Sequence, residues 1–185
     1  LTAMLGCGKH ELRKHPSFQQ AEDCLRERLK IISQAVDEDM EMDLDKFLEL
    51  ARVAVVRHGA KMVVLDPWNE VEHKRRRDES ETEYIGRAIR AIKRFAKQND
   101  VSFWLVAHPA KPVPGVKSIP GLYDISGSAN FANKADYGLT YHRKSFDENE
   151  ALIIVNKVRM GLPGKRGQVR VMFDFRTSEF VTLPD

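Results

Sequence analysis

The chain has 185 residues, of which 42% are hydrophobic and 31% are charged, which is the composition of a globular domain and excludes a disordered polar chain. Two cysteines are too few for a disulfide framework or a structural zinc site, and no apolar run approaches the roughly 18 residues of a membrane helix. The net charge of +3 is compatible with nucleic-acid binding without indicating it. We therefore expect an intracellular protein that does not enter a membrane.

The first half of the chain predicts alternating helices and strands. Apolar residues recur at helical spacing in three segments, with Ser17 and Gly59 as candidate caps, and uninterrupted apolar runs are typical of strands covered on both faces. In chain order, the predicted elements are a helix over 18–28, a short strand over 29–33, a helix over 44–58, a strand over 62–65, a helix over 81–98 and a strand over 101–107.

The second half is rich in strands. A proline-rich loop over 109–120 is too long for a simple connection, which indicates a functional or mobile segment. After a short helical piece following 126–128, strands are predicted over 137–142, 151–158, 168–175 and 179–183. The pattern as a whole predicts an α/β fold whose sheet is parallel in its core and carries an antiparallel extension at its C-terminal end.

Two polar side chains end successive apolar strands. Asp66 follows the strand over 62–65, and His108 follows the strand over 101–107. In open α/β sheets ligands bind at the carboxyl edge of the strands, where an aspartate can hold Mg²⁺ and an imidazole can hydrogen-bond a phosphate. The alternatives are that Asp66 only starts a turn before Pro67 and that the hydrogen bonds of His108 are satisfied within a loop.

Further basic residues fall into two groups. Lys157 and Arg159 alternate along a predicted strand and so point to one face, which fits a pair of cations reaching a neighbour's phosphate site or, alternatively, an edge strand with a solvated face. The run over 74–77, which includes Arg75 and Arg76, and the loop residues Lys111 and Lys117 fit contacts to a phosphate backbone. The alternative is a solvated charge run, which the neighbouring acidic residues favour.

One expected motif is missing from the chain. A phosphate-binding loop needs Gly-x-x-x-x-Gly-Lys-Ser/Thr between a strand and a helix. Neither Gly8-Lys9 nor Gly164-Lys165 is followed by serine or threonine, and neither has the earlier glycine. Because Leu1 is not a methionine, we expect the chain to be cut from a longer protein.

Six short segments, taken together and in order, resemble the helicase half of phage primase–helicases and of Twinkle, which are hexameric, RecA-like replicative DNA helicases. They are 64–70, 80–85, 105–111, 124–129, 134–136 and 155–159. The resemblance covers 44–185, with 1–43 as an N-terminal segment. It implies a single partial RecA-like domain over 1–185, which would be a three-layer sandwich that is truncated at its N-terminal end. It also implies a cytoplasmic protein encoded by a bacterium or a phage.

The resemblance implies a role for each candidate residue. Asp66 would be the magnesium-site aspartate, and His108 would read the γ-phosphate. Lys157 and Arg159 would be fingers inserted into the ATP site of the adjacent subunit. Asn133 falls where relatives carry glutamine, and Arg143 matches a position near the nucleotide base. Lys111 and Lys117 would contact DNA from a loop that faces the central channel.

The function predicted from these residues is that of a DNA helicase motor fragment, with ATP and Mg²⁺ as cofactors and single-stranded DNA as partner. ATP hydrolysis between the subunits of a homo-oligomer, as a hexamer, would drive translocation. The phosphate-binding loop and the catalytic base would precede Leu1, so the fragment alone is expected to be inactive. The alternatives are a non-catalytic RecA-like module for DNA binding or assembly, and a RecA-type ATPase without unwinding.

Overall fold

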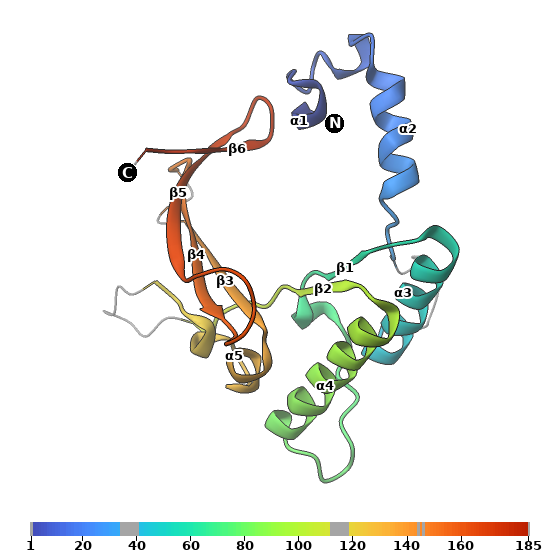
Figure 1. Cartoon of the computed structure of the whole chain (residues 1–185), viewed down its shortest axis with the longest axis vertical. Helices are drawn as coiled ribbons and strands as arrows, with labels where there is room; N and C mark the ends of the chain where they lie inside the picture. Colours follow the sequence, from blue (N-terminus) through green and yellow to red (C-terminus); the bar gives the residue numbers. More distant parts are fainter. Residues whose placement is uncertain (1, 34–40, 112–118, 144, 146, 185) are drawn as a thin grey trace. The chain divides into compact units, whose positions relative to one another are not determined.

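The structure, a computed structural model, describes residues 2–33, 41–111, 119–143, 145 and 147–184. The chain divides into two compact units, one formed by Ile31–Ala135 and the other by Leu1–Lys30 together with Asp136–Asp185. Figure 1 labels the α-helices and strands of both units. The assignment of 1–185 to a single partial domain stays a prediction.

The unit Ile31–Ala135 is built on a two-stranded parallel sheet. Strand β1 (Met62–Leu65) pairs with β2 (Ser102–Leu105) in a register that sets Leu65 opposite Leu105. The connection between the strands passes through the short 3-10 helix η2 (Trp68–Glu70) and the long helix α4 (Glu81–Asn99). Helix α3 (Leu44–His58) precedes β1, and η3 (Leu122–Asp124) and α5 (Asn130–Lys134) follow β2.

The two long helices begin and end at residues whose chemistry fits those positions. The Asp43 carboxylate accepts a hydrogen bond from the Lys46 amide at the start of α3, and Gly59 ends the helix in the left-handed conformation with a φ of 66°. Ser80 and Glu83 form a reciprocal capping box at the start of α4. The helices predicted over 44–58 and 81–98 are therefore confirmed.

The core of this unit lies between the sheet and the helices α3 and α4. Its members are apolar side chains from both helices and from β1, with Leu65 only 2% exposed. The other face of β1 is not covered by the described residues, since Met62 is 57% exposed and Val64 is 49% exposed. The expectation that this strand is covered on both faces is wrong, because α3 and α4 pack on the same side of the sheet.

The other unit contains a four-stranded antiparallel sheet with the order β3-β4-β5-β6. Figure 1 shows these strands following one another as a meander. Their bounds are β3 Tyr137–Arg143, β4 Glu150–Val158, β5 Gly167–Asp174 and β6 Glu179–Thr182. The antiparallel strands predicted for the C-terminal part are confirmed, and they form a sheet separate from β1 and β2.

The N-terminal residues of the same unit are helical. Helices α1 (Thr2–Leu5) and η1 (Leu12–Lys14) precede α2 (Phe18–Arg28), which has the predicted bounds. The Ser17 side chain makes no capping hydrogen bond. The short strand predicted over 29–33 is wrong, because these residues have no strand partner in the described part of the chain and the boundary between the units falls after Lys30.

Within the described ranges, none of the helices combines the length and the apolar character needed to cross a bilayer.

Candidate functional site

Asp66 leaves the parallel sheet at its carboxyl edge, and its side chain is exposed. The chain is fixed on both sides of it, because the Val106 amide donates to the Leu65 carbonyl at 3.0 Å and the Trp68 amide donates to the Val106 carbonyl at 2.8 Å. Trp68 is itself buried against Tyr84 and Phe131. The carboxylate is thus held on a rigid support, as a ligand-binding group requires.

His108 extends from the same edge, three residues after the end of β2, and its side chain is also exposed. Its backbone lies in a short antiparallel contact with the segment before α5. The Ser126 amide donates to the His108 carbonyl at 3.3 Å, and the Ala110 amide donates to the Asp124 carbonyl at 2.7 Å. A shift of His108 would therefore act directly on the segment that leads to α5.

Asn133 lies in α5, at the end of that segment. The Tyr123 hydroxyl donates to Asn133 Oδ1 at 3.0 Å. Helix α5 is tied to α4 by two hydrogen bonds, from Asn130 Nδ2 to the Thr82 carbonyl at 3.0 Å and from Lys93 Nζ to the Lys134 carbonyl at 3.1 Å. Asp66, His108 and Asn133 thus belong to one compact unit, and their elements are linked by backbone and side-chain hydrogen bonds.

The candidate residues Arg143, Lys157 and Arg159 lie in the other unit. Arg143 ends β3, and its Nε donates to the Glu148 carbonyl at 2.8 Å. Arg159 directly follows β4, and its Nε lies 2.7 Å from Oδ1 of Asp136. The Arg159 amide also donates to the Asp136 carbonyl at 2.8 Å. Asp136 therefore holds both the backbone and the side chain of Arg159, which the alternation pattern alone did not indicate.

A β-bulge precedes Lys157 on β4. Gly138 is paired with Lys157 and Leu139 with Val155, so Asn156 is the extra residue. The extra residue breaks the alternation of faces between Val155 and Lys157, and bulges of this kind often re-aim a side chain near a site. Asn156 Nδ2 donates to Thr140 Oγ1 at 2.6 Å and lies 3.4 Å from the Ile154 carbonyl.

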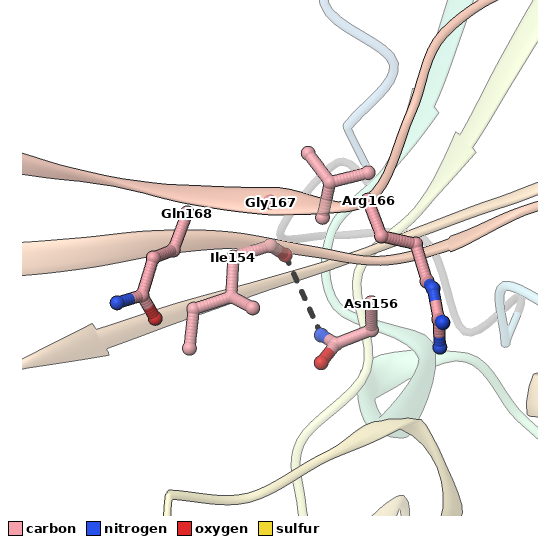
Figure 2. A pocket seen from close by; sticks show the side chains of 6 residues that line it. Ile154, Asn156, Arg166, Gly167 and Gln168 are labelled. Atoms are coloured by element: carbon pink, nitrogen blue, oxygen red, sulfur yellow. Dashed lines mark hydrogen bonds between the residues drawn. The ribbon is translucent and has the colours of Figure 1, made fainter.

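A shallow, open hollow of ≈ 440 Å³ adjoins the bulge. It is lined by Ile154, Val155 and Asn156 of β4, by Arg166, and by Gly167 and Gln168 at the start of β5, and Figure 2 shows it from close by. The amide and guanidinium groups give the hollow a polar wall beside an aliphatic one. None of the predicted site residues lines it.

The basic segment after Asp66 is held by paired charges. Lys74 Nζ lies 2.8 Å from the Asp43 carboxylate, and this hydrogen bond lowers the pKa of Asp43 and raises that of Lys74. The Glu79 carboxylate receives two 2.7 Å hydrogen bonds from Arg87, which lower its pKa to about 2. Arg75 and Arg76 themselves are exposed.

The same segment borders an aromatic cluster. The His73 ring lies 4.5 Å from the Trp68 ring, and His73 Nδ1 is 3.1 Å from the Tyr84 hydroxyl. Burial lowers the pKa of His73 and raises that of Tyr84. A hollow of ≈ 220 Å³ lies over this cluster, lined by Trp68, His73, Arg75, Glu81, Tyr84 and Ile85.

Of the two predicted loop lysines, the structure places only one. Lys111 is exposed and follows the backbone contact that begins at His108. Lys117 and most of the predicted functional loop over 109–120 lie outside the described residues. The expected DNA contacts of the loop stay predictions.

The residues at the Asp66 edge fit a magnesium–nucleotide site. Magnesium in such sites takes one or two carboxylates and completes its shell with phosphate oxygens and water. Asp66 offers one exposed carboxylate, and the described ranges hold no group of three or more metal-binding side chains that would form an all-protein cage. Asp66 can supply the single carboxylate that such a site requires.

Comparison with solved structures defines the class of fold. One solved structure, described as an ATPase domain, matches 99% of this chain and 68% of its own chain with a TM-score of 0.75 at 18% identity. A DnaB-like replicative helicase, solved in a study of its interactions with primase, matches 78% of this chain and 36% of its own with a TM-score of 0.65 at 22% identity. The fold is that of the RecA-like ATPase domains of helicases.

The sequence places the chain in a family within that class. The profile of the family described as DnaB-like helicase C terminal domain matches residues 7–182, so the chain belongs to this family. The chloroplastic/mitochondrial Twinkle homolog protein of Arabidopsis thaliana is 39% identical over 146 aligned residues, and the match covers 76% of this chain. The chain spans about a fifth of the length of that relative, since the match covers 20% of it.

Proposed function

We propose that this chain is part of a DNA helicase motor in which ATP hydrolysis between subunits drives movement along single-stranded DNA. The observation that carries the proposal is the register of the parallel sheet, which brings Asp66 and His108 to one carboxyl edge. Membership of the replicative helicase family supports a helicase and ATPase activity for the protein that contains this region.

In the proposed site, Asp66 holds Mg²⁺ and the His108 imidazole donates a hydrogen bond to the terminal phosphate. Bound Mg²⁺ neutralises negative charge on the phosphates of ATP. Lys157 and Arg159 approach the phosphates of an adjacent subunit of the homo-oligomer, which we propose to be a hexamer, and Asn133 and Arg143 make further contacts to the phosphate and the base.

The proposed coupling between ATP and DNA runs through the backbone of His108. The residues after His108 lead into the 109–120 loop with Lys111, and they also bond to the segment that continues to α5. A change in the contact between His108 and phosphate would thus move both segments. Single-stranded DNA is the proposed partner of Lys111, Lys117, Arg75 and Arg76.

The proposal is tested with Asp66→Asn in the natural full-length protein, with Asp78→Asn as the matched control. Asp78 is an exposed aspartate of the same unit that is remote in sequence from the strand end. We expect Asp66→Asn to lower the rate of ATP turnover by at least about a hundredfold, and Asp78→Asn to leave it near the wild-type rate. Wild-type turnover by Asp66→Asn would contradict the proposal.

A wild-type full-length protein that binds single-stranded DNA and hydrolyses no ATP would favour the non-catalytic module instead. ATP turnover that is stimulated by DNA without strand separation would favour a RecA-type ATPase.

A further inference from the structure

The ion pair between Glu79 and Arg87 joins the basic segment to helix α4. Arg87 Nε donates to Glu79 Oε1 and Arg87 Nη2 donates to Glu79 Oε2, both at 2.7 Å. The Glu79 side chain is 10% exposed and the Arg87 side chain is 32% exposed, so the pair is partly shielded from water. The Arg87 guanidinium also lies 5.1 Å from the centre of the buried Tyr84 ring, which fixes its position on the helix.

The same pair determines the backbone path of the arginine run. Glu79 Oε2 accepts a hydrogen bond from the Arg76 amide at 3.1 Å, and the Glu79 amide donates to the Arg76 carbonyl at 3.1 Å. Arg87 Nη2 lies 3.4 Å from the Lys74 carbonyl. Glu79 and Arg87 therefore fix the segment over 74–79 by hydrogen bonds to its backbone. The capping box of Ser80 follows directly.

The other charges that flank the arginine run are also engaged. Lys74 is paired with Asp43, and Glu83 accepts from Ser80. By contrast, the guanidinium groups of Arg75, Arg76 and Arg77 make no hydrogen bond or ion pair with any residue in the described ranges. The sequence suggests that neighbouring acidic residues neutralise the charge of the arginine run. Two of these residues, Glu79 and Glu83, bind other partners through their carboxylates.

We propose that Glu79 and Arg87 form a clamp, whose role is to hold Arg75, Arg76 and Arg77 in an open arrangement that receives the phosphate backbone of single-stranded DNA. Three adjacent guanidinium groups repel one another, and bidentate binding of phosphates relieves that repulsion. A preformed loop loses less conformational entropy on binding than a free one. The inference rests on the proposed function, of which it explains the DNA-binding part.

The experiment measures the affinity of the full-length protein for a labelled oligothymidylate at fixed salt, and it uses Glu79→Gln as the main variant. Glu79→Gln removes a negative charge, so electrostatics alone would tighten DNA binding. The clamp predicts the opposite, a weakening of about tenfold, because the backbone of the turn that carries the arginines must then be ordered on binding. Tighter binding by Glu79→Gln would overturn the inference.

Two further variants distinguish the loss of the clamp contact from a change in net charge and from a folding defect. Arg87→Lys keeps the charge and loses the two-pronged contact, so we expect severalfold weaker binding by a protein that still unfolds cooperatively. The matched control is Arg90→Ala on the same helix, whose side chain is exposed and for which we expect less than about a twofold effect.

The triple variant Arg75→Ala, Arg76→Ala, Arg77→Ala distinguishes a failure of the proposed DNA contact from a failure of the clamp alone. If this variant binds the oligonucleotide with wild-type affinity, the DNA contact proposed for this segment fails. If it binds more weakly, with a smaller dependence on salt, and all clamp variants bind like wild type, the clamp alone fails.

Discussion

Asp66 and His108 extend from the same edge of the parallel sheet, because Leu65 and Leu105 are paired in register on neighbouring strands. The backbone on both sides of Asp66 is bonded to Val106, two residues before His108. The relative position of the two side chains is therefore set by a hydrogen-bonded ladder and a buried core, which makes this edge suited to bind one ligand from two strands.

The proposed role of Arg159 in ATP hydrolysis by the assembled protein can be tested by substitution. We expect Arg159→Ala to leave nucleotide affinity nearly unchanged and to reduce ATP turnover by at least about a thousandfold, as the loss of an arginine finger does. Because Asp136 binds Arg159 Nε at 2.7 Å, Asp136→Asn should lower turnover by about tenfold through misplacement of the guanidinium. Steady-state turnover and nucleotide binding are measured on the full-length protein.

The control for these variants is Arg170→Ala, which removes another half-exposed arginine of the same sheet that is paired with Glu150. We expect wild-type turnover from it. Lost nucleotide affinity with retained turnover in Arg159→Ala would refute the finger role.

The pH dependence of stability tests the Glu79 contact. Hydrogen bonds from Arg87 lower the pKa of Glu79 from 4.5 to about 2. Because the folded pKa lies below the unfolded one, the stabilisation is complete above the unfolded value of 4.5 and is lost as the pH falls toward 2. Glu79→Gln cannot titrate, so its free energy of unfolding should fall less steeply in this pH range than that of wild type.

Urea unfolding at a series of pH values measures the effect, and Asp78→Asn serves as the control with a nearby exposed carboxylate. Equal slopes for wild type and Glu79→Gln would show that the pair contributes nothing to stability.

The packing of β1 predicts contrasting effects of two truncations. Leu65 is 2% exposed and belongs to the core with α3 and α4, so Leu65→Ala should lower the free energy of unfolding by about 2–5 kcal/mol. Val56 on α3 is 76% exposed, and Val56→Ala should change it by less than about 0.5 kcal/mol. Chemical unfolding measures both, and similar losses for the two variants would contradict the described core.

Local sequence signals were enough to predict the long helices and to locate β1 and β2, although β2 ends at Leu105 and not at residue 107 as predicted. Apolar periodicity identifies α3 and α4, Gly59 marks the end of α3, and the apolar runs before Asp66 and His108 identify the strands. These features depend on residues a few positions apart, which is the range over which capping and periodicity act.

The features that could not be predicted depend on tertiary contacts. The apolar residues of β1 do not reveal that α3 and α4 lie on one side of the sheet, and the alternation of Lys157 and Arg159 does not reveal the bulge at Asn156. The net charge of the basic segment does not reveal which acidic residue forms an ion pair with which basic residue. Glu79 pairs with Arg87 on α4, and this choice leaves the three arginines exposed.

A double-mutant cycle on Asp66 and His108 in the full-length protein measures whether the two side chains bind the same nucleotide. Affinity for ATP in the presence of Mg²⁺ is measured for wild type, Asp66→Asn, His108→Ala and the double variant, with His58→Ala as the control partner. If both side chains bind one nucleotide at the same edge, the two effects should be coupled by about 1 kcal/mol or more. Additivity within about 0.3 kcal/mol, the result expected for His58, would contradict the account.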